Sequence, residues 1–203
     1  MARTGLRNTE NAVDLDFTGV FRLADLKPVE PPPPPPRRIP ENILIGTRSL
    51  QDGNYFVNVT RPRPARTFDP KKTTVLIVED DLPTLNMLEL LLSRVAGYQT
   101  RKANDVPSFV QAIQKKPLVD AVILDVSLQG DVSGFKILAK IRTHPVLRLL
   151  PVIMLSGHTA PEHLLQGLSL GADAYLSKPA RSQAVFDALK TVLGGGGGPA
   201  VKS

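Results

Sequence analysis

The sequence contains no cysteine among its 203 residues, which excludes disulfide bonds and thiolate metal sites. It has no apolar run of the roughly 18 residues that a membrane-spanning helix needs, and no signal-peptide pattern at its start. We therefore expect a cytoplasmic protein with no membrane insertion. The composition, 42% hydrophobic and 22% charged, is ordinary for a globular protein.

Residues 1–72 differ in composition from the rest of the chain. They hold eleven of the nineteen prolines, six of them in the unbroken run Pro31–Pro36. Such a run lacks backbone donors and fixes φ, so it forms a polyproline II rod, either a spacer or a docking segment. Sparse apolar content favours a largely disordered, proline-rich and basic arm over 1–72. Within it, two short apolar runs flanking Asp52-Gly53 resemble a β-hairpin over 43–60.

Positive charge is concentrated in the same arm. Residues 1–72 carry twelve Lys/Arg against eight Asp/Glu, a net charge of +4 out of +6 for the chain. This pattern is typical of a solvated, mildly basic tail, and contact with nucleic acid is the alternative. Base-reading motifs are absent, so we expect nucleic acid to be an unlikely partner.

Residues 73–193 alternate between short apolar runs and amphipathic patterns. Strand, helix, strand repeated five times predicts an α/β fold, a doubly wound parallel sheet with helices on both faces. A flexible Gly-rich tail is expected over 194–203. The predicted strands are 75–79, 98–102, 120–124, 151–155 and 173–176, and the predicted helices are 82–96, 106–115, 133–143, 160–169 and 182–193.

Polar side chains stand where four of these strands end. Glu79, Asp80 and Asp81 end the first, Asp125 the third, Ser156 the fourth, and Lys178 follows the fifth. Binding sites in open parallel sheets gather at the carboxyl ends of the strands, so we expect these groups to meet on one rim. Taken alone, acids after a strand are also typical of a solvated loop that caps the next helix.

This set resembles the receiver domain of two-component response regulators, over about residues 73–193. The resemblance implies a flavodoxin-like, five-stranded parallel sheet of order 2-1-3-4-5. It implies that Asp125 is the phosphoacceptor. It also implies that Mg²⁺ is held by Glu79, Asp80, Asp125 and the backbone carbonyl of Ser127.

The resemblance assigns roles to three further residues. Ser156 would be the switching hydroxyl, Lys178 the ammonium that contacts the phosphoryl group, and Tyr175 the mobile aromatic of the switch. Mg²⁺ prefers oxygen ligands, and clustered carboxylates raise one another's pKa unless cations relieve the repulsion. A carboxylate nucleophile gives an acyl phosphate, whose transfer depends on positioning and on neutralising the phosphoryl oxygens.

The chain departs from the usual receiver pattern after the phosphoacceptor. Leu128 fills a position commonly held by Met, Gln129 replaces the usual Pro, and the loop to Gly134 is one residue longer. A more flexible loop would weaken metal affinity or change the lifetime of the phosphoryl group. Ala180 follows Lys178-Pro179 where Phe is usual, which leaves less apolar surface there.

We expect a single-domain response regulator and not an enzyme. A sensor histidine kinase or histidine phosphotransfer protein would phosphorylate Asp125, and the domain would then bind a downstream protein that the sequence does not identify. One alternative is a pseudo-receiver scaffold that binds partners without phosphorylation, which the altered loop after Asp125 favours. The other is nucleic-acid contact through the basic arm.

Overall fold

The structure is a computed structural model that describes residues 41–58, 68–128 and 132–194. The expectations for the arm before residue 41 and for the tail after residue 194 lie outside the described residues, as does Gln129. The six strands are β1 (Tyr55–Val57), β2 (Thr74–Val78), β3 (Gln99–Ala103), β4 (Ala121–Asp125), β5 (Val152–Ser156) and β6 (Ala174–Ser177). The helices are α1 (Glu41–Gln51), α2 (Leu82–Leu90), α3 (Val106–Gln114), α4 (Gly134–Thr143), α5 (Pro161–Ser169) and α6 (Ser182–Gly194), with a π-helical turn, Leu91–Val95, extending α2.

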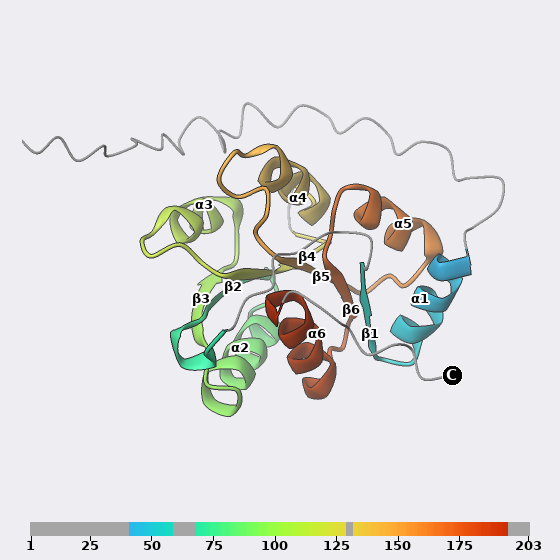
Figure 1. The fold of residues 1–203 in the computed structure, drawn as a ribbon, viewed down its shortest axis with the longest axis horizontal. Helices are drawn as coiled ribbons and strands as arrows, with labels where there is room; N and C mark the ends of the chain where they lie inside the picture. The colour runs from blue at the N-terminus through green and yellow to red at the C-terminus, as the bar shows by residue number, and fades with distance from the viewer. Residues whose placement is uncertain (1–40, 59–67, 129–131, 195–203) are drawn as a thin grey trace, which may run out of the picture.

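The six strands form one sheet in the order β1-β6-β5-β4-β2-β3 (Figure 1). The five strands β2 to β6 are parallel, and their order is the predicted 2-1-3-4-5. Each predicted strand and helix of this part is confirmed to within a residue or two. Strands β2, β4 and β5 are buried along their whole length because helices cover both faces of the sheet.

The sheet divides the apolar core into two layers, and helices cover each of them. Helices α3, α4 and α5 cover one face and α2 and α6 the other (Figure 1). The first layer includes Phe109, Leu138 and Leu164, and the second includes Leu88 and Leu189. Because strands β2 to β6 are parallel, their carboxyl ends all lie on one rim of the sheet.

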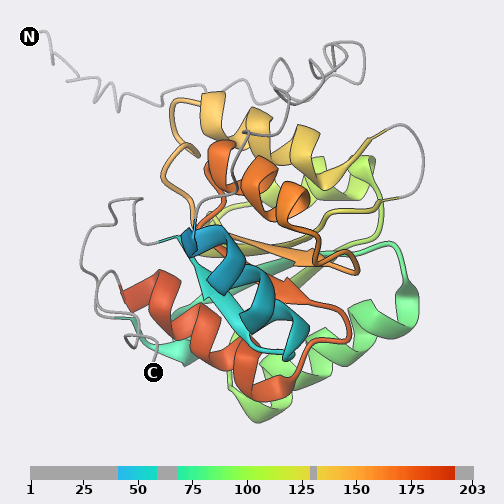
Figure 2. The same ribbon diagram turned by 90° about the vertical axis from the view of Figure 1, so that its right-hand side faces the viewer.

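The predicted hairpin over 43–60 is wrong. Its first half lies in α1, and its second half is β1, which pairs antiparallel with β6 as a sixth strand of the sheet (Figure 2). The helix buries Ile43, Gly46, Thr47 and Leu50, the spacing of one helical face. The 3.6-residue period is hidden in the sequence because two of these four residues are not apolar. The Thr47 hydroxyl is satisfied within the helix, where it donates to the carbonyl of Ile43 at 2.8 Å.

Within the described ranges, no helix is both long and apolar enough to cross a lipid bilayer.

Candidate functional site

The polar groups at the strand ends meet on one rim, as the sequence predicts. Carboxylate oxygens of Glu79, Asp80 and Asp125 all lie within 4.8 Å of one another. Glu79 follows β2 and Asp125 ends β4, and these two strands are neighbours in the sheet. Both side chains are almost completely buried.

Lys178 follows β6 and reaches across the rim to this cluster. Its Nζ lies 2.8 Å from Oε1 and 2.7 Å from Oε2 of Glu79, and 2.9 Å from Oδ2 of Asp125. Burial alone would lower the pKa of the Lys178 ammonium, but the hydrogen bonds and charges of the two carboxylates raise it above its ordinary value. The ammonium is therefore held charged between the two acids.

The pKa of Glu79 is strongly shifted. Its pKa is raised from 4.5 to about 7: burial raises it most, the hydrogen bond and the charge of Lys178 lower it, and the charge of Asp125 raises it. Removing a carboxylate from water disfavours its charged form, and one ammonium shared between two acids does not compensate fully. The buried cluster is therefore short of positive charge.

A divalent cation would neutralise the excess negative charge of the acidic cluster. Oε2 of Glu79 is buried and pairs with Nζ of Lys178 at 2.7 Å, and among the described residues no other group donates to it. When all are ionised, three carboxylates and one ammonium leave a formal charge of −2. Mg²⁺ carries the opposite charge and prefers carboxylate oxygens. The donor set of the cluster therefore suits this ion.

The third acid of the run Glu79-Asp80-Asp81 has a different task. The Asp81 side chain accepts a hydrogen bond from the Thr84 N–H at 3.0 Å and caps α2. Hydrogen bonding to the side chain of Thr84, and then to its backbone N–H, lowers the pKa of Asp81. The run thus divides between the acidic cluster, to which the family resemblance assigns Glu79 and Asp80, and a helix cap made by Asp81.

Ser127 and Ser156 flank the acidic cluster. The Ser127 N–H donates to Oδ1 of Asp125 at 3.1 Å, which orients the carboxylate. Ser156 is buried at the end of β5, next to β4 in the sheet. Its Oγ donates to the carbonyl of His158 at 2.8 Å and accepts from the His158 N–H at 3.0 Å. These two hydrogen bonds of the Ser156 hydroxyl therefore stabilise the turn that leads from β5 to α5.

Tyr175 lies away from the acidic cluster, in the middle of β6. Its ring is buried and its hydroxyl donates to the carbonyl of His163 in α5 at 3.2 Å. The sequence analysis did not single out His158 or His163. Their rings stack at 5.4 Å between centroids, and His163 stacks in turn on Phe135. Two histidines five residues apart give no recognisable sequence signal, because their stacking depends on how α5 follows β5.

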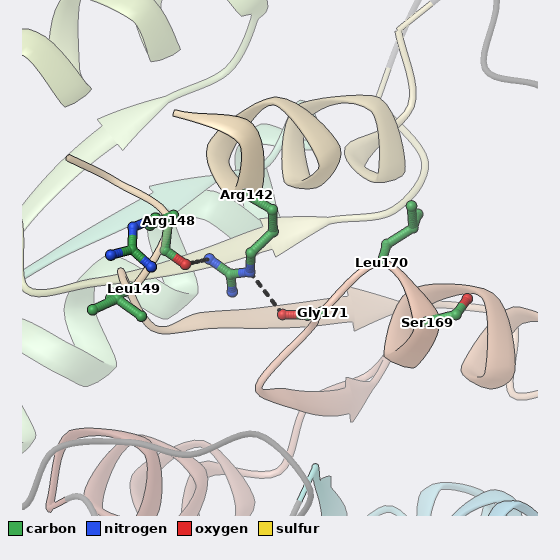
Figure 3. Close-up of a pocket in the computed structure, with 6 residues that line it drawn as sticks. All are labelled: Arg142, Arg148, Leu149, Ser169, Leu170 and Gly171. Atoms are coloured by element: carbon green, nitrogen blue, oxygen red, sulfur yellow. Dashed lines mark hydrogen bonds between the residues drawn. The ribbon is translucent and has the colours of Figure 1, made fainter. Parts of the chain in front are cut away.

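A separate hollow of about 330 Å³ lies near the amino-terminal ends of β5 and β6 (Figure 3). The guanidinium of Arg142 reaches into it and donates to the carbonyl of Gly171 at 2.8 Å. It also pairs with the buried Asp173 at 2.7 Å, and Asp173 accepts from the Val152 N–H at 2.8 Å. These bonds join α4 to the starts of two strands, which is a structural task. The hollow is lined by Arg142, Arg148, Leu149, Ser169, Leu170 and Gly171.

Comparison with known proteins places this geometry in a family. The family model described as the response regulator receiver domain matches residues 75–190. The transcriptional regulatory protein GltR of Pseudomonas aeruginosa is 37% identical over 120 residues, which cover 59% of this chain and 48% of GltR. The phosphate regulon transcriptional regulatory protein PhoB of Escherichia coli is 31% identical over 119 residues, covering 59% of this chain and 51% of PhoB. The chain thus spans about half the length of the curated relatives it matches.

Solved structures show the same fold. Chemotaxis protein CheY4 of Vibrio cholerae superimposes with a TM-score of 0.54 at 28% identity, covering 60% of this chain and 98% of CheY4. A CheY-like receiver domain protein of Methanospirillum hungatei gives a TM-score of 0.52 at 26% identity, covering 60% of this chain and 93% of that protein. In both cases the matched part is about three fifths of the chain.

Proposed function

The chain belongs to the response regulator receiver domain family, and on that premise we propose that Asp125 accepts a phosphoryl group from a histidine kinase or histidine phosphotransfer protein. Receiver domains generally interact with such phosphodonors, and they generally bind Mg²⁺ at an acidic pocket. The domain would signal by binding a downstream protein when phosphorylated, and would itself carry no enzymatic module.

One observation carries the proposal: the two oxygens of the Asp125 carboxylate are held by different donors. Oδ2 lies 2.9 Å from the Lys178 ammonium, and Oδ1 accepts from the Ser127 N–H at 3.1 Å. A carboxylate with a purely structural task in the core would be expected to cap a helix or join two elements. This one lies at the carboxyl end of β4, on the rim beside two further acids.

The transfer of the phosphoryl group to Asp125 would be a simple displacement at phosphorus. An oxygen of the Asp125 carboxylate attacks the phosphorus of a phosphohistidine, the P–O bond of an acyl phosphate forms, and the P–N bond breaks with its electron pair returning to the imidazole nitrogen. Negative charge on the transferred oxygens is greatest in the transition state. Lys178 already lies against Asp125, so its ammonium can contact one of these oxygens without a large movement.

The acidic cluster would hold Mg²⁺ through Glu79, Asp80, Asp125 and the backbone carbonyl of Ser127. When bound, this ion supplies positive charge that neutralises the phosphoryl oxygens and the clustered carboxylates. Glu79 contributes to this arrangement from a buried position, and the close approach of its carboxylate to those of Asp80 and Asp125 supports its assignment as a ligand.

Ser156 and Tyr175 would convert phosphorylation into a change of shape. The phosphoryl group adds acceptor oxygens to which the Ser156 hydroxyl could donate in place of the His158 carbonyl. Releasing that bond would free the turn between β5 and α5, the helix whose His163 carbonyl accepts from the Tyr175 hydroxyl. Phosphorylation would then bias two arrangements of this region by its differential contacts.

The experiment is phosphorylation of the full chain with acetyl phosphate and Mg²⁺, followed by intact mass spectrometry. We expect a gain of one phosphoryl group that is lost in Asp125→Asn and kept in Asp187→Asn, a matched change on the exposed side of α6. No gain in the wild-type chain would reject the proposal and would favour a scaffold that binds partners without phosphorylation.

A further inference from the structure

Residues 41–58, which comprise α1, β1 and the asparagine that follows, are docked on the edge of the sheet beside α5 and α6 (Figures 1 and 2). We call this segment the cover. It lies outside residues 75–190, the part of the chain that matches the receiver family, so the family fold does not account for it. The cover is therefore a segment added to the edge of the receiver fold.

Backbone hydrogen bonds hold the cover to β6. Strand β1 pairs antiparallel with β6, with Val57 opposite Ala174. The Asn58 N–H donates to the carbonyl of Asp173 at 2.9 Å, and the Asn58 side-chain amide donates to the carbonyl of Ala172 at 3.0 Å. The cover thus satisfies backbone groups that β6 would otherwise present on its open side.

The side chains of the cover bury apolar surface on both faces of the sheet. Ile43 and Leu50 of α1 are each only 2% exposed and belong to the same apolar cluster as Leu164 of α5. Successive side chains of a strand point to opposite faces of its sheet. Phe56 accordingly packs on the apolar cluster of the α5 side, and Val57 packs on the cluster of the α6 side. Removing the cover would therefore expose apolar side chains as well as backbone groups.

Helix α1 lies very close to the rest of the protein at one residue, Gly46. A Cβ atom at Gly46 would come within 2.6 Å of the Phe56 ring and 2.8 Å of Leu164. A leucine side chain has no room there, so Gly46→Leu should lift α1 away from β1 and α5. This substitution therefore provides a way to displace the cover in the full chain.

The two edges of the parallel sheet β2 to β6 differ in composition. Strand β3 forms one edge and carries Arg101 and Lys102, and charged residues on an edge strand oppose pairing with another chain. Strand β6 forms the other edge and has no charged residue over Ala174–Ser177. An uncharged, apolar edge strand is a template for pairing with another chain unless it is covered. Of the two edges, β6 is therefore the one that needs a cover.

The pairing of β1 indicates which kind of partner fits this edge. The open side of β6 accepts an antiparallel strand, because β1 pairs with it in that direction. A second copy of the chain, related by a two-fold axis, would present its own β6 antiparallel at the same edge. Most homodimers use such a self-complementary contact. Two uncharged strands would not repel each other there.

We propose that the cover, residues 41–58, occupies an interface for a second copy of this chain and keeps the chain monomeric while it is docked. Nine residues, 59–67, join the cover to the next described segment. A short tether gives an effective concentration of about 1 mM, whereas a second copy competes at about 1 μM. The cover therefore prevails in the intact chain, and its displacement opens β6 to the second copy. This surface is separate from the acidic cluster, and its role does not depend on phosphorylation of Asp125.

The test is sedimentation velocity of the full chain from about 1 to about 100 μM, below the effective concentration of the tethered cover. We expect the wild type to remain a monomer across this range. In Gly46→Leu, we expect a dimer to form at a concentration at least about tenfold lower than any dimer of the wild type, because the tethered competitor is displaced. Leu44→Ala, a change on the exposed face of α1, should stay monomeric like the wild type.

Hydrogen exchange locates the contact. In Gly46→Leu at low concentration, the amides of β6 that face β1 should exchange faster than in the wild type. At concentrations where the dimer forms, they should regain protection. A released cover in a chain that stays monomeric would overturn the proposal. So would a dimer whose β6 amides remain unprotected, open-ended aggregation in place of a dimer, or a wild type that dimerises with its cover docked.

Two further changes keep the test decisive if Gly46→Leu fails to fold. Ile43→Ala with Leu50→Ala weakens the docking of α1 without adding any atom to the core, and should give the same dimer. The chain lacks cysteine, so Val57→Cys with Ala174→Cys adds one pair across β1 and β6. When this pair is added to the weakened chain and oxidised at low concentration, it should restore the monomer, and reduction should bring the dimer back. A dimer that persists in the oxidised form would overturn the proposal.

Discussion

Replacing Glu79 by Gln should remove a pH dependence of stability that the metal-free protein owes to this one buried carboxyl. The folded pKa of Glu79 is about 7 and its ordinary value is 4.5. Between these two values the folded chain binds more protons than the unfolded chain. The stability from this group is therefore fully present below about pH 4.5 and is lost as the pH rises through about 7.

The size of the effect follows from the shift. A difference of about 2.5 pKa units, at about 1.4 kcal/mol per unit, gives a loss of about 3 kcal/mol in the free energy of unfolding. His144 acts in the opposite direction, since burial lowers its pKa and its contribution to stability is lost as the pH falls. His144 is present in both proteins, so the difference between wild type and Glu79→Gln isolates the carboxyl.

The assay is urea unfolding followed by circular dichroism, at steps from about pH 5 to about pH 8 in excess EDTA. We expect the wild type to lose about 3 kcal/mol relative to Glu79→Gln across this range. The exposed change Glu89→Gln should follow the wild type. Saturating Mg²⁺ should flatten the wild-type profile, because a bound cation stabilises the charged carboxylate. Parallel profiles of wild type and Glu79→Gln in EDTA would refute the reasoning.

Three further predictions concern the site and the opposite end of the sheet. Asp80→Ala should abolish Mg²⁺-dependent phosphorylation, because it removes a carboxylate of the acidic cluster. Asp81→Ala, which removes the cap of α2, should leave phosphorylation intact. Equal losses of phosphorylation in the two variants would contradict these separate roles. Asp173→Ala removes the carboxylate of a largely buried ion pair, so thermal or urea unfolding should show a loss of about 3–5 kcal/mol, whereas Glu89→Ala, in an exposed ion pair, should cost less than about 1 kcal/mol. Ser156→Ala should still be phosphorylated by acetyl phosphate, but the shifts of the β6 amide signals on phosphorylation should shrink; full-size shifts would argue against the switch.

The sequence predicts the parallel core and the composition of its rim. Strands β2, β4 and β5 are buried on both faces, because helices cover both sides of the sheet. Strands of this kind are apolar at nearly every position, and such uninterrupted apolar runs can be recognised in the sequence. Glu79, Asp125 and Lys178 end or follow strands of one parallel sheet, so their meeting on one rim follows from local pattern and topology. The strand order came from the family resemblance, and the structure confirms it.

Tertiary contacts decided the rest. The helix α1 could not be recognised because Gly46 and Thr47 occupy half of its buried stripe, and Gly46 lies against Phe56 and Leu164, which only the folded chain brings there. β1 became a strand of this sheet through pairing with a segment more than a hundred residues away, as the bond from Asn58 to Ala172 shows. Local propensity is blind to such contacts, since their energy comes from surfaces that exist only after the chain has folded. The family resemblance assigned Glu79 and Asp80 to the metal site, but only the folded chain showed that Glu79 pairs with Lys178 and that Asp81 caps α2.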